Sequence, residues 1–317
     1  MTTITNNEEE GVMKTRKLVV LSAVMLMLVF PTTQGFVAEW HEFVETMGIN
    51  GSANWSTGII TATGIGSPPE KYYGKPQARP MALRAAQLDA YRNLLEVTKG
   101  VRVDSVTMVK DSMVESDVIH SQVSGMVNGA RIIKKEYLSD GTVEVTLALS
   151  LRGGFAQLIL PKDIKQVSEI KTIPQAPPTP PEKEKVREAL VPPSPEPSTP
   201  TPAPAIYTGL VVDARGLSAR PAMSPKILDE SGQEVYGSAY VSREFAVQQG
   251  MAGYAKDLTA SQTNPRVTNE PLTVKGLRTE GAGRCNLVIS NADAAKIRGA
   301  SDNLSFLKKC RVMIVLD

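Results

Sequence analysis

An aspartate and two arginines follow one apolar run in the C-terminal third of the chain, and their types suit the binding of a small charged ligand. Asp213 and Arg215 come directly after the predicted strand 206–212, and Arg220 follows five residues after Arg215. Functional groups in α/β proteins often lie just past the end of a buried strand. We therefore treat Asp213, Arg215 and Arg220 as candidate ligand-binding residues for an anionic or peptidic ligand. The alternative is an ion pair between Asp213 and Arg215 that only orders a glycine-containing turn.

Residues suited to catalysis are scarce in this sequence. The two histidines, His41 and His120, lie far apart without a nearby cysteine, so their spacing does not fit a zinc site. The motifs of a nucleophile elbow and of a phosphate-binding loop are absent. Gly64 and Gly66 match only the start of a dinucleotide fingerprint, because Pro69 stands at its third glycine. We therefore expect a protein that is not an enzyme, with no catalytic residue, no metal and no cofactor.

The two cysteines, Cys285 and Cys310, each open an apolar run near the end of the chain. If these runs form neighbouring strands, the two sulfurs come within bonding distance, and an oxidising compartment would let them pair. The sequence thus makes Cys285 and Cys310 a candidate disulfide. Its closed loop of about 25 residues would contribute roughly 3 kcal/mol. The alternative is two unpaired, half-buried thiols.

The N-terminal region has the pattern of a secretory signal. Basic residues between 14 and 17 are followed by the apolar run 18–30 and then by small residues. As a helix this run would span about 20 Å, short of the roughly 30 Å hydrocarbon core of a bilayer. We expect residues 1–35 to be a cleaved signal, with Met13 as an alternative start. The remaining chain would have no transmembrane span and would lie in the periplasm, where a position peripheral to the outer membrane is one alternative.

Composition limits the classes of partner. The hydrophobic fraction is 42% and the net charge is only +2, with no sustained basic stripe, so we expect no binding to nucleic acid. Residues 174–204 hold twelve of the 22 prolines, which favours an extended polyproline II segment that cannot build a core. We interpret residues 166–205 as a linker between a domain at 37–165 and a second domain at 206–317.

Hydrophobic periodicity predicts an α+β fold made of two small mixed domains joined by the proline-rich linker. In the first domain, a helix at 80–99 with Gly100 as its cap and a second helix beginning at Ser116 or Asp117 cover one face of a sheet. The strongest strand follows the turn Asp140-Gly141 and alternates apolar and polar residues. The other predicted elements of this domain are a short helix at 40–47 and strands at 57–65, 101–109 and 130–138.

The second domain has weaker signals, which indicate an α/β or α+β arrangement. A helix is predicted at 242–256 and another begins at an Asn291 cap and ends at Arg298. The predicted strands are at 206–212, within a hairpin at 226–236, at 285–290 and at 311–316.

The sequence resembles the Lpp-twenty outer-membrane lipoprotein family in several segments that follow one another in order. These are the strand at 62–66, the segment 78–105, the run 129–133 and the turn 140–145. The same region is similar to the N-terminal part of flagellar outer-ring assembly proteins. The resemblance covers about residues 57–160 and implies a non-catalytic envelope module. Family members carry an acylated cysteine after the signal, and this sequence has none there, so direct lipid anchoring does not carry over.

These observations together favour an exported, non-enzymatic cell-envelope protein that acts in scaffolding or assembly at the outer membrane or the flagellar basal body. Its expected partners are envelope or flagellar-ring proteins, and the sequence leaves peptidoglycan binding and self-association open. The alternative function is a periplasmic ligand-binding module, for peptidoglycan or a peptide, that uses the turn at Asp213 and Arg215.

Overall fold

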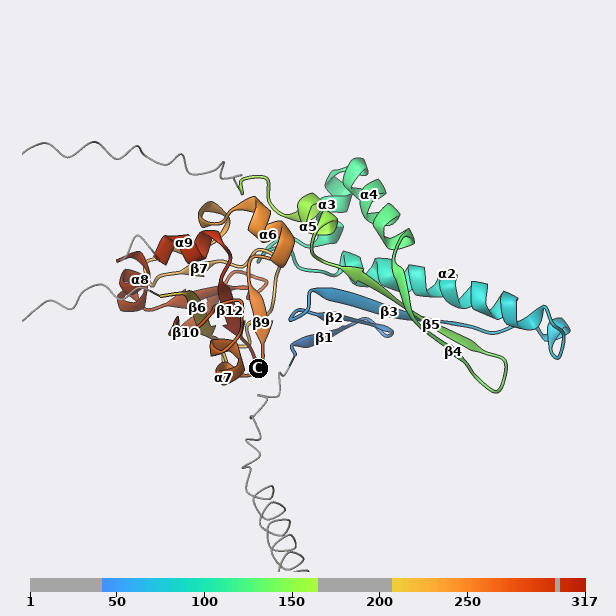
Figure 1. Cartoon of the computed structure of the whole chain (residues 1–317). Coiled ribbons are helices and arrows are strands. Elements are labelled where there is room, and N and C mark those ends of the chain that lie inside the picture. The colour runs from blue at the N-terminus through green and yellow to red at the C-terminus, as the bar shows by residue number, and fades with distance from the viewer. Residues whose placement is uncertain (1–41, 165–206, 300–302) are drawn as a thin grey trace, which may run out of the picture. The chain divides into compact units, whose positions relative to one another are not determined.

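The computed structural model describes residues 42–164, 207–299 and 303–317 (Figure 1). Its fold is α+β, as the sequence predicts, and its strands form two separate sheets. The predicted signal, His41 and the proline-rich segment 166–205 lie outside the described residues. Within the described ranges, no helix combines the length and apolar character that a membrane crossing requires.

The first sheet is antiparallel throughout and lies in residues 42–164, which we call the N-terminal half. Its central pair, β3 and β5, runs in register from Ile59↔Ser150 to Gly66↔Val143. The alternation of β5 buries its apolar positions, as predicted. The strand order is β1-β2-β3-β5-β4, with β1 (Val44–Met47), β2 (Gly51–Asn54), β3 (Ile59–Gly66), β4 (Arg131–Tyr137) and β5 (Val143–Ser150).

Helix α2 (Ala78–Lys99) packs against one face of this sheet at very short range. A Cβ atom on Gly64 would lie 2.0 Å from the backbone nitrogen of Ala90, and one on Gly66 would lie 2.3 Å from the carbonyl oxygen of Ala82. Glycine in a strand interior marks such close approach of another backbone. The predicted helix at 80–99, with its buried face and Gly100 at its end, is therefore confirmed.

Three shorter helices complete the N-terminal half: α3 (Val109–Glu115), α4 (Asp117–Asn128) and α5 (Gly154–Ile159). The predicted second helix is α4, which packs against α2. Its N-cap is Ser116, whose hydroxyl accepts a hydrogen bond from the backbone nitrogen of Ile119 at 3.4 Å.

The second sheet is mixed and lies in residues 207–317, the C-terminal half. Strand β6 pairs in parallel with both β10 and β12, and β12 pairs in parallel with β9, so these strands end at one edge of the sheet. The strand order is β8-β7-β11-β10-β6-β12-β9, with β6 (Gly209–Asp213), β7 (Ile227–Leu228), β8 (Glu234–Tyr236), β9 (Gly253–Ala255), β10 (Pro271–Glu280), β11 (Asn286–Ile289) and β12 (Val312–Val315). Its helices are α6 (Arg243–Gln249), α7 (Leu258–Gln262), α8 (Asn291–Arg298) and α9 (Asn303–Lys308).

The two halves contribute to one hydrophobic cluster and are also joined by main-chain hydrogen bonds. The backbone nitrogen of Met223 donates to the carbonyl of Arg102 at 3.0 Å, and that of Ser224 donates to the carbonyl of Val103 at 2.7 Å. The hydroxyl of Ser56 donates to the carbonyl of Tyr254 at 2.6 Å. The segments around residues 102 and 223 thus pair directly, although more than a hundred residues of chain separate them.

Two predictions for the N-terminal half are wrong. The described part of segment 40–47 contains strand β1 instead of a helix, because Gly48 (φ +68°) opens a turn that pairs β1 with β2. The predicted strand at 101–109 is a turn with a single bridge between Arg102 and Met108. The carboxylate of Asp104 accepts hydrogen bonds from the backbone nitrogens two and three residues ahead, both at 2.8 Å, and so closes that turn.

Two predictions for the C-terminal half also need correction. The helix predicted at 242–256 ends at Gln249, because Gly250 adopts φ +82° and the chain continues into β9. Helix α8 is capped by Ser290 instead of Asn291, since the Ser290 hydroxyl accepts a hydrogen bond from the backbone nitrogen of Asp293 at 3.0 Å. The predicted hairpin at 226–236 and the last strand are present as β7–β8 and β12.

Candidate functional site

The predicted turn after β6 is built around a two-pronged ion pair. The guanidinium of Arg215 donates from Nε to Oδ1 of Asp213 and from Nη2 to Oδ2, both at 2.8 Å. The backbone nitrogen of Arg215 also donates to Oδ1 at 3.2 Å. Both oxygens of Asp213 are thus occupied by one neighbour two residues away. This is the geometry of a carboxylate that orders its own turn.

Charge around this turn favours the ionised pair. The hydrogen bond to Arg215, aided by the charge of Lys275 on the adjacent strand, lowers the pKa of Asp213. The same hydrogen bond raises the pKa of Arg215, and the charges of Asp257 and Asp317 act in the same direction. The pair therefore remains charged across the neutral pH range.

The position of the turn is the one expected for a ligand site in a parallel sheet. It lies where β6, β12 and β9 end, and Asp257 begins α7 at that edge. The backbone nitrogen of Gly216 donates to both carboxylate oxygens of Asp317 at 2.9 Å. The carboxylates of Asp213 and Asp317 already accept hydrogen bonds from the chain, whereas Arg215 uses only two of its five side-chain N–H donors on Asp213.

Arg220, the third predicted ligand residue, belongs to a different part of the molecule. Its Nη2 lies 3.3 Å from Oε1 of Glu45 in β1, and its backbone nitrogen donates to the carbonyl of Arg284 at 2.9 Å. The structure gives no contact between Arg220 and Asp213 or Arg215. The predicted three-residue site is therefore divided between two locations.

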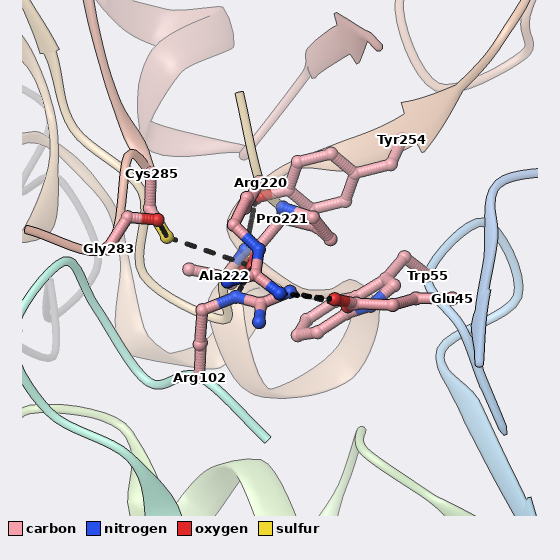
Figure 2. A network of polar contacts seen from close by, with 9 residues as sticks. All are labelled: Glu45, Trp55, Arg102, Arg220, Pro221, Ala222, Tyr254, Gly283 and Cys285. Atoms are coloured by element: carbon pink, nitrogen blue, oxygen red, sulfur yellow. Dashed lines mark hydrogen bonds and ion pairs between the residues drawn. The ribbon is translucent and has the colours of Figure 1, made fainter. Parts of the chain in front are cut away.

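Glu45 is the centre of the second location, a polar network that connects the two halves (Figure 2). Its Oε2 accepts hydrogen bonds from Nη2 of Arg102 and from the indole nitrogen of Trp55, the latter at 3.0 Å. Figure 2 shows the guanidinium groups of Arg102 and Arg220 both directed at this carboxylate. Nε of Arg102 donates onward to the carbonyl of Pro221 at 2.9 Å. The carboxylate of Glu45 thus accepts hydrogen bonds from two arginines and one indole.

The electrostatics of Glu45 follow from these contacts. Burial acts to raise its pKa, but the hydrogen bonds and charges of Arg102, Trp55 and Arg220 outweigh it, and the pKa of Glu45 is lowered. The Arg102 side chain is only 6% exposed. A buried guanidinium needs a counter-charge, and Glu45 supplies it.

Aromatic rings and a main-chain loop complete this network. The Trp55 and Tyr254 rings meet edge to face with centroids 5.9 Å apart, and the Arg102 guanidinium lies 6.0 Å from the indole. The Tyr254 hydroxyl donates to the carbonyl of Ala222 at 2.7 Å and accepts from the backbone nitrogen of the same residue at 3.0 Å. The loop 220–222 is thus held from both sides by side chains.

A pocket of about 400 Å³ lies beside this network. Its lining combines Glu45, Arg102 and Arg220 with the β1–β2 turn and with Asn93 and Glu96 from the last turns of α2. The volume is sufficient for a small polar molecule. Glu45, Arg102 and Arg220 are already paired with one another there, and Glu96 adds a further carboxylate to the lining.

The cysteines do not form the predicted disulfide. Both are free and buried in the structure. They precede β11 and β12, and the strands β10 and β6 lie between these two, so the premise of neighbouring strands is wrong. The Cys285 thiol lies 3.2 Å from the carbonyl of Gly283. Burial raises the pKa of both thiols to about 11, which makes them poor nucleophiles.

Sequence reasoning missed Glu45 and Arg102. Glu45 lies in a segment whose pattern predicts a helix, and Arg102 lies in one whose pattern predicts a strand. Their pairing depends on contacts 57 residues apart in sequence, which no local pattern reports. The only sequence signal was Arg102 itself, a charged residue between Val101 and Val103, both of which are buried.

A comparison with known protein families gives a match in the C-terminal half. The family model for the second domain of Tp0624 from Treponema pallidum matches residues 209–317. The matched segment begins at the first residue of β6 and so includes every strand of the second sheet. It covers about a third of the chain. A search among curated proteins found no match.

Proposed function

We propose that this protein is a non-enzymatic, exported component of the cell envelope that acts as a scaffold or assembly factor at the outer membrane or the flagellar basal body. The observation that carries the proposal is the network around Glu45. Its charged groups are used to join the two halves, with each arginine directed at the same carboxylate. A part that holds partners in place needs such internal rigidity, whereas catalysis needs groups left available for a substrate.

The resemblance of residues 57–160 to the Lpp-twenty family supports an envelope location in this proposal. The signal-like segment before residue 36 supports export. The match of the C-terminal half to one domain of a protein with at least two domains agrees with a modular role. The absence of a cysteine after the signal favours attachment through a partner over a lipid of its own.

Affinity purification tests the assembly role. A tagged chain is recovered from detergent-treated envelopes after mild crosslinking, beside a control chain lacking residues 1–35, which should remain in the cytosol. We expect specific envelope proteins to co-purify with the exported chain and not with the control. Recovery of the exported chain as a partner-free monomer at every stage of growth would reject the role.

A second candidate is a ligand-binding module for peptidoglycan or a peptide at the turn of Asp213 and Arg215. The observation in its favour is the position of this turn at the edge where parallel strands end. Sedimentation with purified cell wall tests it, using Asp213→Ala beside Glu136→Ala, which removes an exposed ion pair of the same 2.8 Å length with Lys134. Binding that is lost only in Asp213→Ala supports the module, and equal behaviour of both variants rejects it.

A further inference from the structure

One end of the first sheet brings cationic and apolar side chains together. The loop before α2 and the β4–β5 turn meet there, where the hydroxyls of Ser67 and Thr142 lie 3.1 Å apart (Figure 1). A hollow of about 620 Å³ is lined by residues of both segments, among them Lys75, Arg79 and Leu138. We call this region, residues 67–84 and 134–141, the tip.

The tip is more basic than the rest of the molecule. It carries six lysines and arginines and three acids, a net charge of +3, whereas the whole chain has only +2. Its basic residues are Lys71, Lys75, Arg79, Arg84, Lys134 and Lys135. The excess positive charge of the protein is therefore concentrated at this end.

Large apolar side chains are exposed among these cations. Tyr73 is 54% exposed, Tyr137 is 51% exposed and Leu138 is 45% exposed. Arg79 lies 5.5 Å from the Tyr137 ring, and Lys71 and Lys75 lie 5.0 and 5.7 Å from the neighbouring Tyr72 ring. Rings and cations thus form a single mixed surface.

We propose that the tip binds the surface of an anionic lipid bilayer. Lysine and arginine are attracted to anionic headgroups, and tyrosine is enriched at the membrane–water boundary because its ring is apolar and its hydroxyl is polar. Lys71, Lys75 and Arg79 would contact phosphates while Tyr73 and Leu138 enter the interface. An acidic protein partner would match the charge but would leave the exposed apolar side chains unexplained.

This inference deepens the proposed scaffold role and rests on it for one point, the presence of the protein at a membrane. Its test uses purified components and is separate from the co-purification, so that either result can fail alone. The exported, processed chain is mixed with vesicles of phosphatidylcholine that contain phosphatidylglycerol, and with vesicles of phosphatidylcholine alone. We expect sedimentation with the first and not with the second.

A charge variant gives the decisive comparison. Each Lys or Arg near an anionic surface contributes about a fivefold gain in partitioning, so Lys75→Gln with Arg79→Gln should weaken binding roughly 25-fold. Raising the salt from about 0.1 M to about 1 M should have a similar effect. Lys308→Gln with Lys309→Gln removes two exposed lysines outside the tip and should leave binding unchanged.

An apolar variant separates lipid from a merely acidic partner. Tyr73→Ser with Leu138→Ser keeps every charge and should still weaken vesicle binding severalfold. Three results would overturn the proposal: no binding to the anionic vesicles, equal losses in the tip and control charge variants, or unchanged vesicle binding in Tyr73→Ser with Leu138→Ser together with equally tight binding to soluble polyglutamate. The last result would assign the tip to an acidic protein instead.

Discussion

At the scale of single residues, the Glu45 carboxylate has the largest expected effect, because it compensates the charge of a buried arginine. Among the described residues, Glu45 is the acid that Arg102 contacts, and the other side-chain hydrogen bond of Arg102 goes to the main-chain carbonyl of Pro221. Removing one partner of a buried pair is far more costly than removing an exposed pair, because it leaves a charge without compensation.

Glu45→Gln should lower the free energy of unfolding by about 3 kcal/mol at neutral pH, since it leaves Arg102 without its counter-charge. Urea unfolding measures this difference. The matched control is Glu136→Gln, which breaks an exposed pair with Lys134 and should cost about 0.5 kcal/mol or less. Equal effects of the two substitutions would contradict the central role of Glu45.

The same pair makes the stability depend on pH in a defined direction. The pKa of Glu45 is lower in the folded state than in the unfolded state. The contribution of its carboxylate to the free energy of unfolding is therefore complete above the unfolded-state pKa of about 4.3, and it is lost as the pH falls through the folded-state pKa. The difference between the parent and Glu45→Gln should therefore shrink as the pH decreases from about 5 to about 3. A difference that stays constant over this range would mean that Glu45 is not ionised in the fold.

Buried thiols give a third prediction at the residue scale. With pKa values near 11 and no solvent access, Cys285 and Cys310 should react slowly with a thiol reagent in the native, unreduced protein. Unfolding without reductant should then release two reactive thiols. The variants Cys285→Ser and Cys310→Ser should each release one. Failure to detect thiols after unfolding would restore the disulfide.

At the scale of elements, the contact of α2 with β3 depends on glycine. Gly64→Ala should destabilise the protein by about 3 kcal/mol or more, because its Cβ would overlap the backbone of α2 and push the helix off the sheet. Gly125→Ala is the matched control, since this helical glycine has open space around its Cβ position and alanine favours helix by about 1 kcal/mol. Urea unfolding midpoints should thus move in opposite directions.

The elements that sequence predicted are those with strong local patterns. The periodic apolar face of α2 and the alternation of β5 are set by residues within one segment, and both were recognised. Strand β10 was missed, because it begins with Pro271, contains a bulge after Gly276 and includes three charged residues, features that locally resemble a loop. Its pairing with β6 and β11 overrides that local signal.

The candidate site also has one part that follows from local sequence and one part that depends on long-range contacts. The ion pair of Asp213 and Arg215 involves residues two positions apart, and the sequence suggested it as one of two alternatives. Arg220 was grouped with them by proximity along the chain, although its partner Glu45 is 175 residues away. Contacts between residues so far apart in the sequence depend on how the two halves pack, and no local sequence pattern reports that packing.

At the scale of the whole molecule, buried residues of both halves contribute to one large hydrophobic cluster, and a smaller second cluster lies in the second sheet. We predict a single cooperative unfolding transition, followed by calorimetry and by circular dichroism. Leu287→Ala in the second sheet and Leu94→Ala in α2 should each lower the midpoint temperature of that single transition by several degrees. Two separate transitions, each sensitive to only one variant, would contradict this prediction.

The edge-to-face packing of Trp55 on Tyr254 has a practical consequence. These rings come from opposite halves, and the indole is 5% exposed beneath the Arg102 guanidinium. Tryptophan emission shifts to longer wavelength when water reaches the ring. With Trp40→Phe removing the other indole of the chain, Trp55 becomes an intrinsic optical reporter of separation between the halves. Binding of a partner or a bilayer that separates the halves would then be detected as a shift of the Trp55 emission maximum, without an attached dye.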